Sequence, residues 1–461
     1  MSGFASLLRT VERRLAAAGV EGRTLALALS GGMDSMVLLD VLSALAPTLR
    51  FRLSALHVHH GLSPNADDWA GFCERECASR RVALRIERVR VAPDSGLGLE
   101  AAARHERYRC LRRSGTDVVA TAHHLDDQAE TVLLQMLRGA GVEGTAAMPF
   151  ERALGVGGPM LVRPLLDVAR ADLHAVASER GVRWITDESN ADVRHARNFL
   201  RANVLPLIET RFPAWRETLA RVARNAADAG ELAATLAAGD LARVLDGDGL
   251  LVDGVVALSP ARRFNVVRHW LRMHGIAMPP RQRLESALTQ LLDARCDAAP
   301  CTVLGAVTLR RHAGRLLLDP ADASPPGWHA RWNGEPTLAL PDGRTLHFDA
   351  VVGDGVSCAR LADRQVEVGF RIGGERLQLA ANRPRRALKK LLQEAGMPPW
   401  ERSRLPLLRV GGEPAWVDGI GRRQGSGAVE QSGRNPHPSC TSGRVPRKGA
   451  WRCAGAGSVC A

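Results

Sequence analysis

The sequence predicts an α/β fold in which a doubly wound parallel sheet is followed by a mainly helical domain and a small α+β domain. The first observation is that residues 1 to about 200 alternate short β-rich runs with segments of helical period. Such alternation implies right-handed crossovers and a parallel sheet covered by helices on both faces. The second observation is a change of pattern at about residue 215, after which the chain is helical and rich in Ala, Leu and Arg up to about residue 295.

The expected elements of the first part follow one another in strand and helix order. Strands are expected at 24–30, 51–59, 82–91, 116–122 and 182–187, with a shorter run near 160–163. Helices are expected at 33–46, 65–81, 99–114, 125–138 and 168–180. The strand candidates are β-rich, whereas the helix candidates repeat apolar residues at helical spacing.

The remaining sequence divides into shorter pieces. Residues 302–353 contain short β-like runs with PDG and GDG turn signals, and SPPGWHARWNGEP at 324–336 predicts a linker. Residues 366–421 predict a compact unit with a strand (EVGFRI), a basic helix (RPRRALKKLLQEAG) and a closing strand (PAWVDGI). We therefore expect domains at 1–214, 215–323 and 366–421, a linker and β-rich connection at 324–365, and a tail at 422–461.

The tail at 422–461 is dominated by Gly, Ser, Pro and Arg and has no apolar periodicity. Such a composition cannot bury enough apolar surface to offset the entropy of ordering it, so we expect disorder. Over the whole chain, 62 Lys and Arg residues exceed 49 Asp and Glu residues, and nearly half of the surplus lies in the tail. An arginine surplus favours a phosphate-rich partner, although nucleotide composition bias produces the same surplus.

Composition also excludes several classes of protein. A chain of 461 residues is too long for one core, and 45% hydrophobic with 24% charged residues is ordinary for a soluble protein. No apolar run approaches the roughly 18 residues of a membrane helix, and the N-terminus lacks a secretory core, so we expect a cytoplasmic protein without a membrane partner. The nine cysteines are irregularly spaced without a C-x-x-C pair, which predicts free thiols.

The stretch LALALSGGMDSMVLL, residues 25–39, joins the first expected strand to the first expected helix. Free backbone N–H groups and the positive end of the helix dipole meet at such a junction, and together they bind anions. Two glycines allow close approach and positive φ, two hydroxyls can donate, and a carboxylate can hold a Mg²⁺ that bridges phosphates. The candidate phosphate-binding residues are therefore Ser30, Gly31, Gly32, Met33, Asp34 and Ser35. The alternative is a plain turn with a helix cap.

A second group of candidate residues lies in TAHHLDDQAETVLLQMLRG, residues 121–139. His123, Asp127 and Glu130 recur at i, i+4 and i+7, which places them on one helix face, with Thr131 adjacent. Carboxylates and an imidazole at the carboxyl edge of a sheet could coordinate Mg²⁺ or accept a proton from an amine. The alternative is a capped, solvated helix start, and this is the role expected for Asp126.

The Ser-Gly-Gly-Met-Asp-Ser string resembles the pyrophosphate loop of the N-type ATP pyrophosphatases, which split ATP between the α and β phosphates. Residues 1–421 as a whole resemble the bacterial tRNA(Ile)-lysidine synthetases. The matching pieces are HVHHGLS at 57–63, EAAARHERYRCL at 100–111, HHLDDQAETVLLQMLRGAG at 123–141, RPLLD at 163–167 and DESNADVRHARNFLRANVLP at 187–206.

This resemblance implies an adenine nucleotide α hydrolase-like sheet and an ATP-dependent ligase. In such an enzyme ATP adenylates the C2 carbonyl of the wobble cytidine of tRNA(Ile) with a CAU anticodon, and the ε-amine of L-lysine then displaces AMP. The resemblance implies that Asp127 orients or deprotonates lysine, while Glu130 and Asp34 serve Mg²⁺ or the lysine ammonium.

Arginines complete the implied site. Arg197 and Arg201 lie four residues apart, where a guanidinium pair could neutralise the α-phosphate. The alternative is a surface pair that contacts tRNA or nothing. Arg104 and Arg107 could face either the adenylate or the RNA, and nothing local decides between these.

The basic stretch near the C-terminus resembles the tRNA-binding unit of the same family. Its basic residues are expected to crowd one end of a helix and to contact backbone phosphates, the alternative being a solvated basic face. These residues are Arg383, Arg385, Arg386, Lys389 and Lys390. The helical segment 215–295 is expected to help hold the tRNA. The tail departs from the family pattern, as a reading-frame change near codon 421 would.

Two other functions stay open at this point. A tRNA thiolase of the same ATP-pyrophosphatase group would need a sulfur carrier, but Cys73 and Cys77 are spaced for helix packing. A catalytically inactive tRNA-binding relative would retain the fold, and the intact acidic residues argue against it. The sequence leaves the oligomeric state open, a homodimer being one option.

Overall fold

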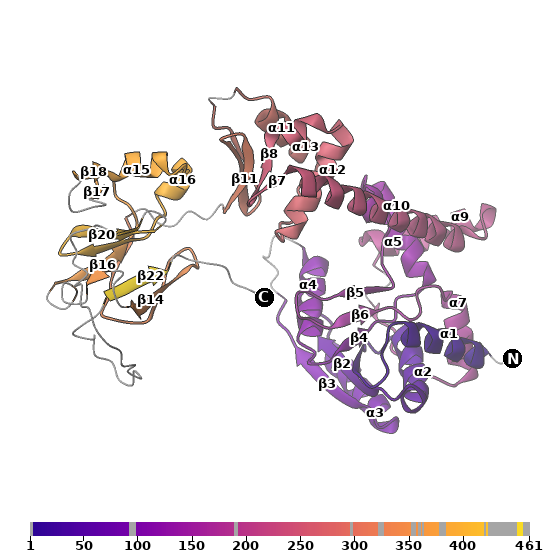
Figure 1. Cartoon of the computed structure of the whole chain (residues 1–461). Coiled ribbons are helices and arrows are strands. Elements are labelled where there is room, and N and C mark those ends of the chain that lie inside the picture. The colour runs from indigo at the N-terminus through magenta and orange to yellow at the C-terminus, as the bar shows by residue number, and fades with distance from the viewer. Residues whose placement is uncertain are drawn as a thin grey trace. The chain divides into compact units, whose positions relative to one another are not determined.

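The computed structural model describes most of the chain in two compact units, Met1–Leu236 and Ala237–Ala461 (Figure 1). The described residues are 3–91, 98–188, 192–295, 298–320, 327–351, 356–357, 361, 364–377, 384–418, 421–422 and 450–454. Among these residues, no helix is both long enough and apolar enough to cross a bilayer.

The first unit alternates strands and helices as the sequence predicts. Its strands are β1 (Thr24–Ala28), β2 (Arg52–His59), β3 (Ala83–Arg88), β4 (Val118–Ala120), β5 (Glu151–Ala153) and β6 (Met160–Val162). Its helices are α1 (Gly3–Ala17), α2 (Met33–Leu49), α3 (Ala66–Ser79), α4 (Leu99–Arg112), α5 (Leu125–Leu137), α6 (Val142–Thr145), α7 (Arg170–Glu179), α8 (Ala196–Phe199), the π-helical turn η2 (Leu200–Val204), α9 (Leu205–Arg211) and α10 (Trp215–Val244).

The strands of this unit form one sheet in the order β3-β2-β1-β4-β6-β5. All neighbouring pairs are parallel except β5 with β6. The predicted doubly wound α/β fold is therefore confirmed. The strand order reverses beside β1, so the carboxyl ends of β1 and β4 flank the crevice where ligands bind in open sheets of this kind.

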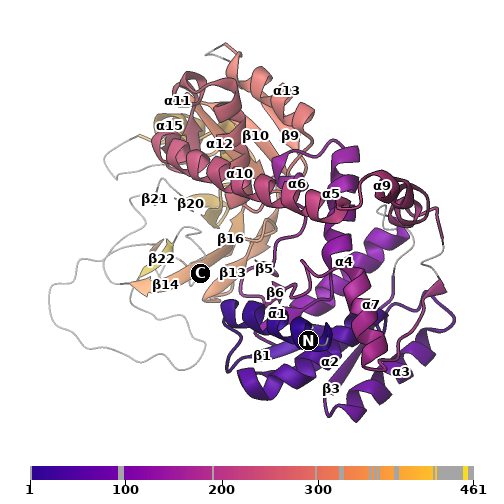
Figure 2. The same cartoon turned by 90° about the vertical axis from the view of Figure 1, so that its right-hand side faces the viewer.

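Alternate residues of the central strands pack into two separate cores. Leu25 and Leu27 of β1 lie in the core made with α1, α2, α3 and α7, whereas Ala26 lies in the core made with α4. Helices α1, α2 and α7 pack against one another (Figure 2). Because side chains alternate between the faces of a strand, continuous apolar strands are what a sheet covered on both faces requires.

One expected strand of the first unit is absent. Residues 182–187 have no regular secondary structure. The backbone N–H of Ile185 instead donates to the carbonyl of Gly31 at 2.9 Å, so this segment lies against the turn after β1. The apolar residues that predicted a strand serve other contacts: Val182 is buried in the first core, Trp184 meets the ring of His174, and Ile185 lies next to Gly31.

The second unit is richer in antiparallel strands. Its helices are α11 (Val252–Ala257), α12 (Pro260–Met273), α13 (Arg281–Leu292), α15 (Leu388–Glu394) and α16 (Pro399–Arg402). Its strands are β7 (Leu245–Asp246), β8 (Gly249–Leu251), β9 (Cys301–Leu304), β10 (Val307–His312), β11 (Arg315–Pro320), β12 (His329–Arg331), β13 (Thr337–Ala339), β14 (Thr345–Val351), β15 (Val356–Ser357), β16 (Val366–Gly369), β17 (Arg376–Leu377), β18 (Arg386–Ala387), β19 (Leu407–Val410), β20 (Glu413–Val417), β21 (Gly421–Arg422) and β22 (Ala450–Ala454).

These strands form several sheets. Helices α12 and α13 share a core with the sheet β7-β8-β11-β10-β9. Two further sheets have the orders β12-β16-β19-β20-β21 and β13-β14-β22-β15, and β17 pairs with β18. The helical prediction for 215–295 missed the short strands β7 and β8, which pair with each other and, through β8, with β11.

Two expectations about the second unit differ from the structure. Strand β12 lies inside the predicted linker 324–336 but pairs with β16, and Trp332 is buried in the same core as Phe370. Strand β22 lies inside the tail that we expected to be disordered, yet it pairs with β14 and β15. A propensity argument could not foresee either strand, because each is stabilised by partners distant in sequence. Residues 423–449 and 455–461 of the tail lie outside the described residues.

Candidate active site

The turn between β1 and α2 is a phosphate-binding loop in its geometry. The hydroxyl of Ser30 lies 3.1 Å from that of Ser35, and the N–H of Gly32 donates to Ser30 Oγ at 3.3 Å. Ser35 Oγ in turn donates to the carbonyl of Gly32 at 2.9 Å. Helix α2 begins at Met33 without a side-chain cap, so the N–H groups of its first turn remain available to an anion.

Gly31 is held in a conformation that other residues rarely adopt. Its φ is +84°, and a Cβ at this position would lie 2.4 Å from Ile185 Cδ1 and 3.2 Å from Cys73 Sγ. The predicted need for positive φ is thus confirmed for Gly31. It is wrong for Gly32, whose φ is −70° in extended backbone.

Helix α5 carries the acidic residues, and its start differs from the prediction. His124 is the N-cap of α5, and His123 precedes the helix instead of lying on it. Asp127 N–H donates to His124 Nδ1 at 3.3 Å, while His124 N–H donates to Asp127 Oδ2 at 3.2 Å. This reciprocal capping box fixes the direction of both side chains.

His124 is the residue that the sequence reasoning missed. It is 2% exposed, and its Nε2 lies 3.6 Å from Asp34 Oδ2 and 3.4 Å from Asp127 Oδ2. The imidazole therefore joins the phosphate loop to the acidic helix. The sequence did hold a signal for this residue, since a capping box pairs an N-cap with an acidic residue three positions later, as His124 and Asp127 are spaced.

Charge around His124 and Asp127 shifts both of their pKa values. Burial would lower the pKa of His124, but hydrogen bonding to Asp34 and the charges of Asp127 and Asp126 raise it above the ordinary value. Burial would raise the pKa of Asp127, but His124, His123 and two arginines lower it. Asp127 is accordingly a carboxylate at neutral pH.

Glu130 is nearly buried, with a side chain that is 3% exposed. Arg201 Nε donates to Glu130 Oε1 at 2.6 Å, and Arg201 Nη2 donates to Asp127 Oδ1 at 2.9 Å. Arg197 Nε lies 3.4 Å from Glu130 Oε2, and Arg197 Nη2 donates to Thr131 Oγ1 at 2.7 Å. Burial raises the pKa of Glu130 although Arg201 opposes the shift. Both arginines therefore contact the acidic helix α5.

The remaining predicted residues of this segment have other surroundings. His123 Nδ1 lies 2.9 Å from Thr121 Oγ1, and burial lowers the pKa of His123 to about 3, so its ring is neutral. Asp126 accepts hydrogen bonds from Arg170 N–H at 2.9 Å and from Arg216 Nε at 2.5 Å. Asp126 thus has a structural role, as predicted, but it is ion-paired and not solvated, with a side chain that is 13% exposed.

The acidic residues were tested for a Mg²⁺ site. No group of three or more metal-binding side chains occurs within the described ranges. Asp34 Oδ1 and Glu130 Oε2 are nevertheless buried oxygens without a hydrogen-bond partner among those residues. Mg²⁺ commonly takes one or two carboxylates together with substrate phosphates and water, and Asp34 at the phosphate loop fits that pattern.

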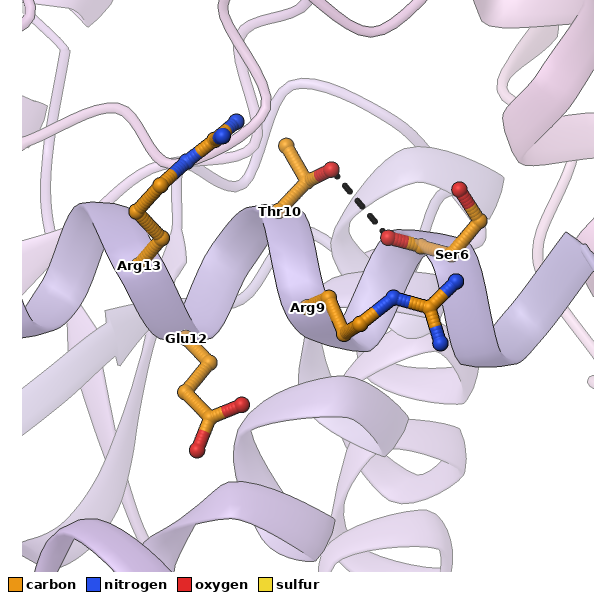
Figure 3. A pocket seen from close by; sticks show the side chains of 5 residues that line it. All are labelled: Ser6, Arg9, Thr10, Glu12 and Arg13. Carbon is orange, nitrogen blue, oxygen red and sulfur yellow. Dashed lines mark hydrogen bonds between the residues drawn. The ribbon is translucent and has the colours of Figure 1, made fainter.

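A surface hollow of about 480 Å³ lies elsewhere on the first unit (Figure 3). All of the side chains that line it come from α1, and none of them follows a strand of the sheet. They are Ser6, Arg9, Thr10, Glu12 and Arg13. The Thr10 hydroxyl donates to the Ser6 carbonyl at 3.1 Å, which is an internal bond of the helix. The candidate active site is therefore the group of residues at the carboxyl edge of the sheet and not this hollow.

The predicted tRNA-binding residues are only partly on a helix. Lys389 and Lys390 are exposed on α15, and no ion pair is recorded for either within the described part of the chain. Arg386 lies in β18 and pairs with Glu394, while Arg385 pairs with Glu413 at 2.9 Å. Arg383 lies outside the described residues.

Comparisons with known proteins agree with this arrangement. Family models match at residues 7–208 (PP-loop domain), 250–317 (TilS substrate binding domain) and 366–435 (TilS substrate C-terminal domain).

Curated relatives match over nearly the whole chain. A tRNA(Ile)-lysidine synthase from Alkalilimnicola ehrlichii is 42% identical over 417 residues, covering 89% of this chain and 93% of that protein. One from an Azoarcus species is 43% identical, covering 91% of this chain and 90% of that protein. One from Aromatoleum aromaticum is 44% identical, covering 88% and 95% respectively. With a phosphate loop, an acidic helix and all three domain matches in order, the chain belongs to the tRNA(Ile)-lysidine synthase family.

Proposed function

We propose that this chain acts in the cytoplasm, using ATP to join L-lysine to C2 of the wobble cytidine of tRNA(Ile) with a CAU anticodon. AMP and pyrophosphate are the other products. The observation that carries the proposal is His124, whose Nε2 lies within 3.6 Å of both Asp34 and Asp127. Because His124 lies between Asp34 on the phosphate loop and Asp127 on α5, a nucleotide bound at the loop and an amine bound at α5 would lie in one site.

The first step activates the nucleobase. The O2 oxygen of cytidine attacks the α-phosphorus of ATP, the bond to the bridging oxygen of the β-phosphate breaks, and pyrophosphate leaves. The first-turn N–H groups of α2 and the hydroxyls of Ser30 and Ser35 receive the departing pyrophosphate. The adenylated oxygen is now part of AMP, which is a far better leaving group.

The second step joins lysine to the base. Asp127, ionised because its pKa is lowered, binds the ε-ammonium, and Glu130, with its raised pKa, is the better acceptor of the proton that must be lost. The freed amine attacks C2, and the C2–O bond to AMP breaks. Arg197 and Arg201 hold the two carboxylates in place and stand beside the phosphate charge.

Divalent metal and tRNA contacts complete the proposal. A Mg²⁺ bound through Asp34 would neutralise phosphate charge while ATP is held. Lys389 and Lys390 are exposed, so we assign them to backbone phosphates of the tRNA. Arg385 and Arg386 contribute less, since each is already paired with a glutamate.

A tRNA thiolase is less well supported. Burial raises the pKa of Cys73 to about 12 and that of Cys77 to about 11, so both thiols are protonated at neutral pH. A protonated, buried thiol is a poor nucleophile or sulfur carrier.

The test is incorporation of radiolabelled lysine into tRNA(Ile) transcripts with ATP. We expect lysine-dependent release of AMP, and no release when sulfide replaces lysine. The Asp34→Asn variant should lose both labelling and AMP release while remaining folded. Incorporation of sulfur in place of lysine would overturn the proposal.

A further inference from the structure

Tyr108 is the single tyrosine of the chain, and arginine side chains surround it. The guanidinium carbon of Arg104 lies 5.0 Å from the centre of its ring, and that of Arg152 lies 5.1 Å from it. Arg104 Nη2 also donates to the Tyr108 hydroxyl at 3.4 Å. Two guanidinium groups and one phenol, from α4 and β5, thus form a stacked group.

A third arginine lies beneath this group. Arg163 follows β6 directly and is 2% exposed. Its Nη1 donates to the Pro149 carbonyl at 2.6 Å, but its Nε has no hydrogen-bond partner among the described residues. A buried guanidinium is normally paired with an anion, because removing its charge from water is costly.

Within the described residues, no ion pair with a carboxylate is recorded for Arg104, Arg152 or Arg163. Glu106 of α4 pairs with Arg109. The positive charge of the arginines lowers the pKa of the Tyr108 phenol. Burial would raise this pKa, but Arg104, Arg163, Arg152 and Arg107 outweigh the effect of burial. The cluster therefore holds excess positive charge at rest.

The cluster lies beside the active site. The charges of Arg163, Arg107 and Arg104 all act on the ring of His123, which lies three residues after β4. Strands β4 and β6 are parallel neighbours, so the residues after them lie at one edge of the sheet. An anion bound here would be adjacent to the reacting groups without occupying the phosphate loop.

We propose that Arg104, Tyr108, Arg152 and Arg163 form a binding site for a backbone phosphate of the tRNA anticodon loop, next to the cytidine that reacts. Charge excludes lysine, and the phosphates of ATP are already assigned to the loop at Ser30 and Ser35, so RNA is the anionic substrate that remains. Lysine carries a net positive charge and is repelled by several arginines, whereas RNA carries a negative charge at every nucleotide. Exposed guanidiniums stacked on an aromatic ring also suit an RNA strand, whose bases and phosphates they can both contact.

The inference rests on the proposed function for the identity of the RNA. The kinetic test compares the double variant Arg104→Gln/Arg152→Gln with Arg112→Gln, which removes a charge from the other end of α4. We expect the double variant to raise the KM for tRNA about tenfold, leave the KM values for lysine and ATP unchanged, and flatten the salt dependence of tRNA binding. An equal effect of Arg112→Gln would overturn the proposal.

The second test uses the lone tyrosine as a reporter. Protein labelled with ¹³C at Cζ of tyrosine gives one resonance, which is titrated with an anticodon stem-loop, with lysine and with ATP. We expect the stem-loop to shift the resonance and to raise the pKa of the phenol, and lysine or ATP alone to leave both unchanged.

Two outcomes of this titration would overturn the proposal: a shift caused by lysine alone, or no shift at a saturating concentration of stem-loop. The readout does not require turnover. A response to RNA in a protein that incorporates no lysine would therefore refute the proposed function while leaving the phosphate site in place.

Discussion

Glu76 and Glu130 occupy similar settings in the first unit, and yet only one of them is a candidate for chemistry. Glu76 of α3 is 5% exposed at its side chain and accepts from Arg80 Nη1 at 2.8 Å and Arg183 Nη2 at 2.5 Å. Glu130 of α5 is 3% exposed and is likewise flanked by two arginines. A buried glutamate with two arginines is therefore not by itself a sign of catalysis.

The two glutamates differ in their location and in whether both carboxylate oxygens have a hydrogen-bond partner. Both oxygens of Glu76 are engaged by arginine, whereas Oε2 of Glu130 has no hydrogen-bond partner among the described residues. Glu130 lies one helical turn beyond Asp127, which contacts His124 at the carboxyl edge. Glu76 instead anchors Arg183, two residues before Ile185, which packs against Gly31. Glu130 is the proposed proton acceptor, whereas Glu76 holds the segment that contacts the phosphate loop.

The largest expected effect comes from removing the charge of Glu130. Glu130→Gln should lower kcat for lysine incorporation by about 100-fold or more, because a proton acceptor is lost. The melting temperature should change little, since Gln keeps the shape of the side chain, Arg201 keeps Asp127 as a partner and Arg197 keeps Thr131. Single-turnover incorporation assays and thermal melts measure the two quantities.

The matched variant Glu76→Gln should behave in the opposite way. It removes a buried carboxylate that two arginines share and leaves Arg80 with only the more distant Asp40 at 3.6 Å, so we expect a loss of about 2 kcal/mol in unfolding free energy. The kcat of the protein that remains folded should stay within about threefold of the original. Denaturant unfolding and activity assays at low temperature compare Glu76→Gln with Glu130→Gln. An equal loss of kcat in both variants would contradict the assignment of catalysis to Glu130 alone.

Gly31→Ala tests the contact between the phosphate loop and Ile185, which lies two residues after Arg183, the partner of Glu76. The added Cβ meets Ile185 and adopts positive φ, so we expect a cost of about 1 to 3 kcal/mol and a raised KM for ATP. Gly32→Ala is the control, because its φ is negative and the nearest atom to a Cβ is Ser30 Oγ at 3.5 Å. Isothermal titration with ATP distinguishes them, and similar affinities would show that the loop tolerates both.

Substitutions at His124 distinguish its role as the N-cap of α5 from its contacts with Asp34 and Asp127. His124→Ala should cost about 1 kcal/mol of stability through loss of the N-cap, whereas His124→Asn should keep the cap. Neither variant can reach both Asp34 and Asp127, so both should lower kcat while only the first lowers the melting temperature. Normal kcat in His124→Asn would remove the bridge from the mechanism.

The smallest expected effect is a pH dependence at Glu130. Its folded-state pKa is raised, so ionisation disfavours the fold, and the stability present below the unfolded pKa is lost as pH rises through the folded value. Relative to the original protein, Glu130→Gln should therefore gain stability between mildly acidic and neutral pH. Urea unfolding of both proteins at acidic and neutral pH measures this difference, and a constant difference would refute it.

The sequence predicted the sheet, the phosphate loop and the acidic helix well, because each depends on local pattern. A β-rich apolar run and the placement of the glycines predicted β1, Gly31 and α2, and the helix expected at 125–138 is α5 (Leu125–Leu137). Asp127, Glu130, Arg197 and Arg201 do lie together, joined by direct contacts. Their individual roles stay predictions.

Other features depended on contacts that no local pattern reveals. His123 was favoured over His124 because helical spacing was counted from a residue that the capping box leaves outside the helix. The apolar residues of 182–187 contact the first core, the ring of His174 and the phosphate loop, and they do not pair as a strand. The arginines around Tyr108 come from α4, β5 and the end of β6, so only the fold brings them together.

The π-helical turn η2 changes the direction in which the residues after it point relative to those before it. Leu200 and Leu205 lie five residues apart and are both buried in one core with Ala129 and Trp215. A regular α-helix, with about 3.6 residues per turn, would point these leucines to different sides. The wider turn keeps both inward while Arg201, between them, still reaches Glu130. Deleting one residue within the turn would therefore break either the packing of the two leucines or the contact of Arg201 with Glu130.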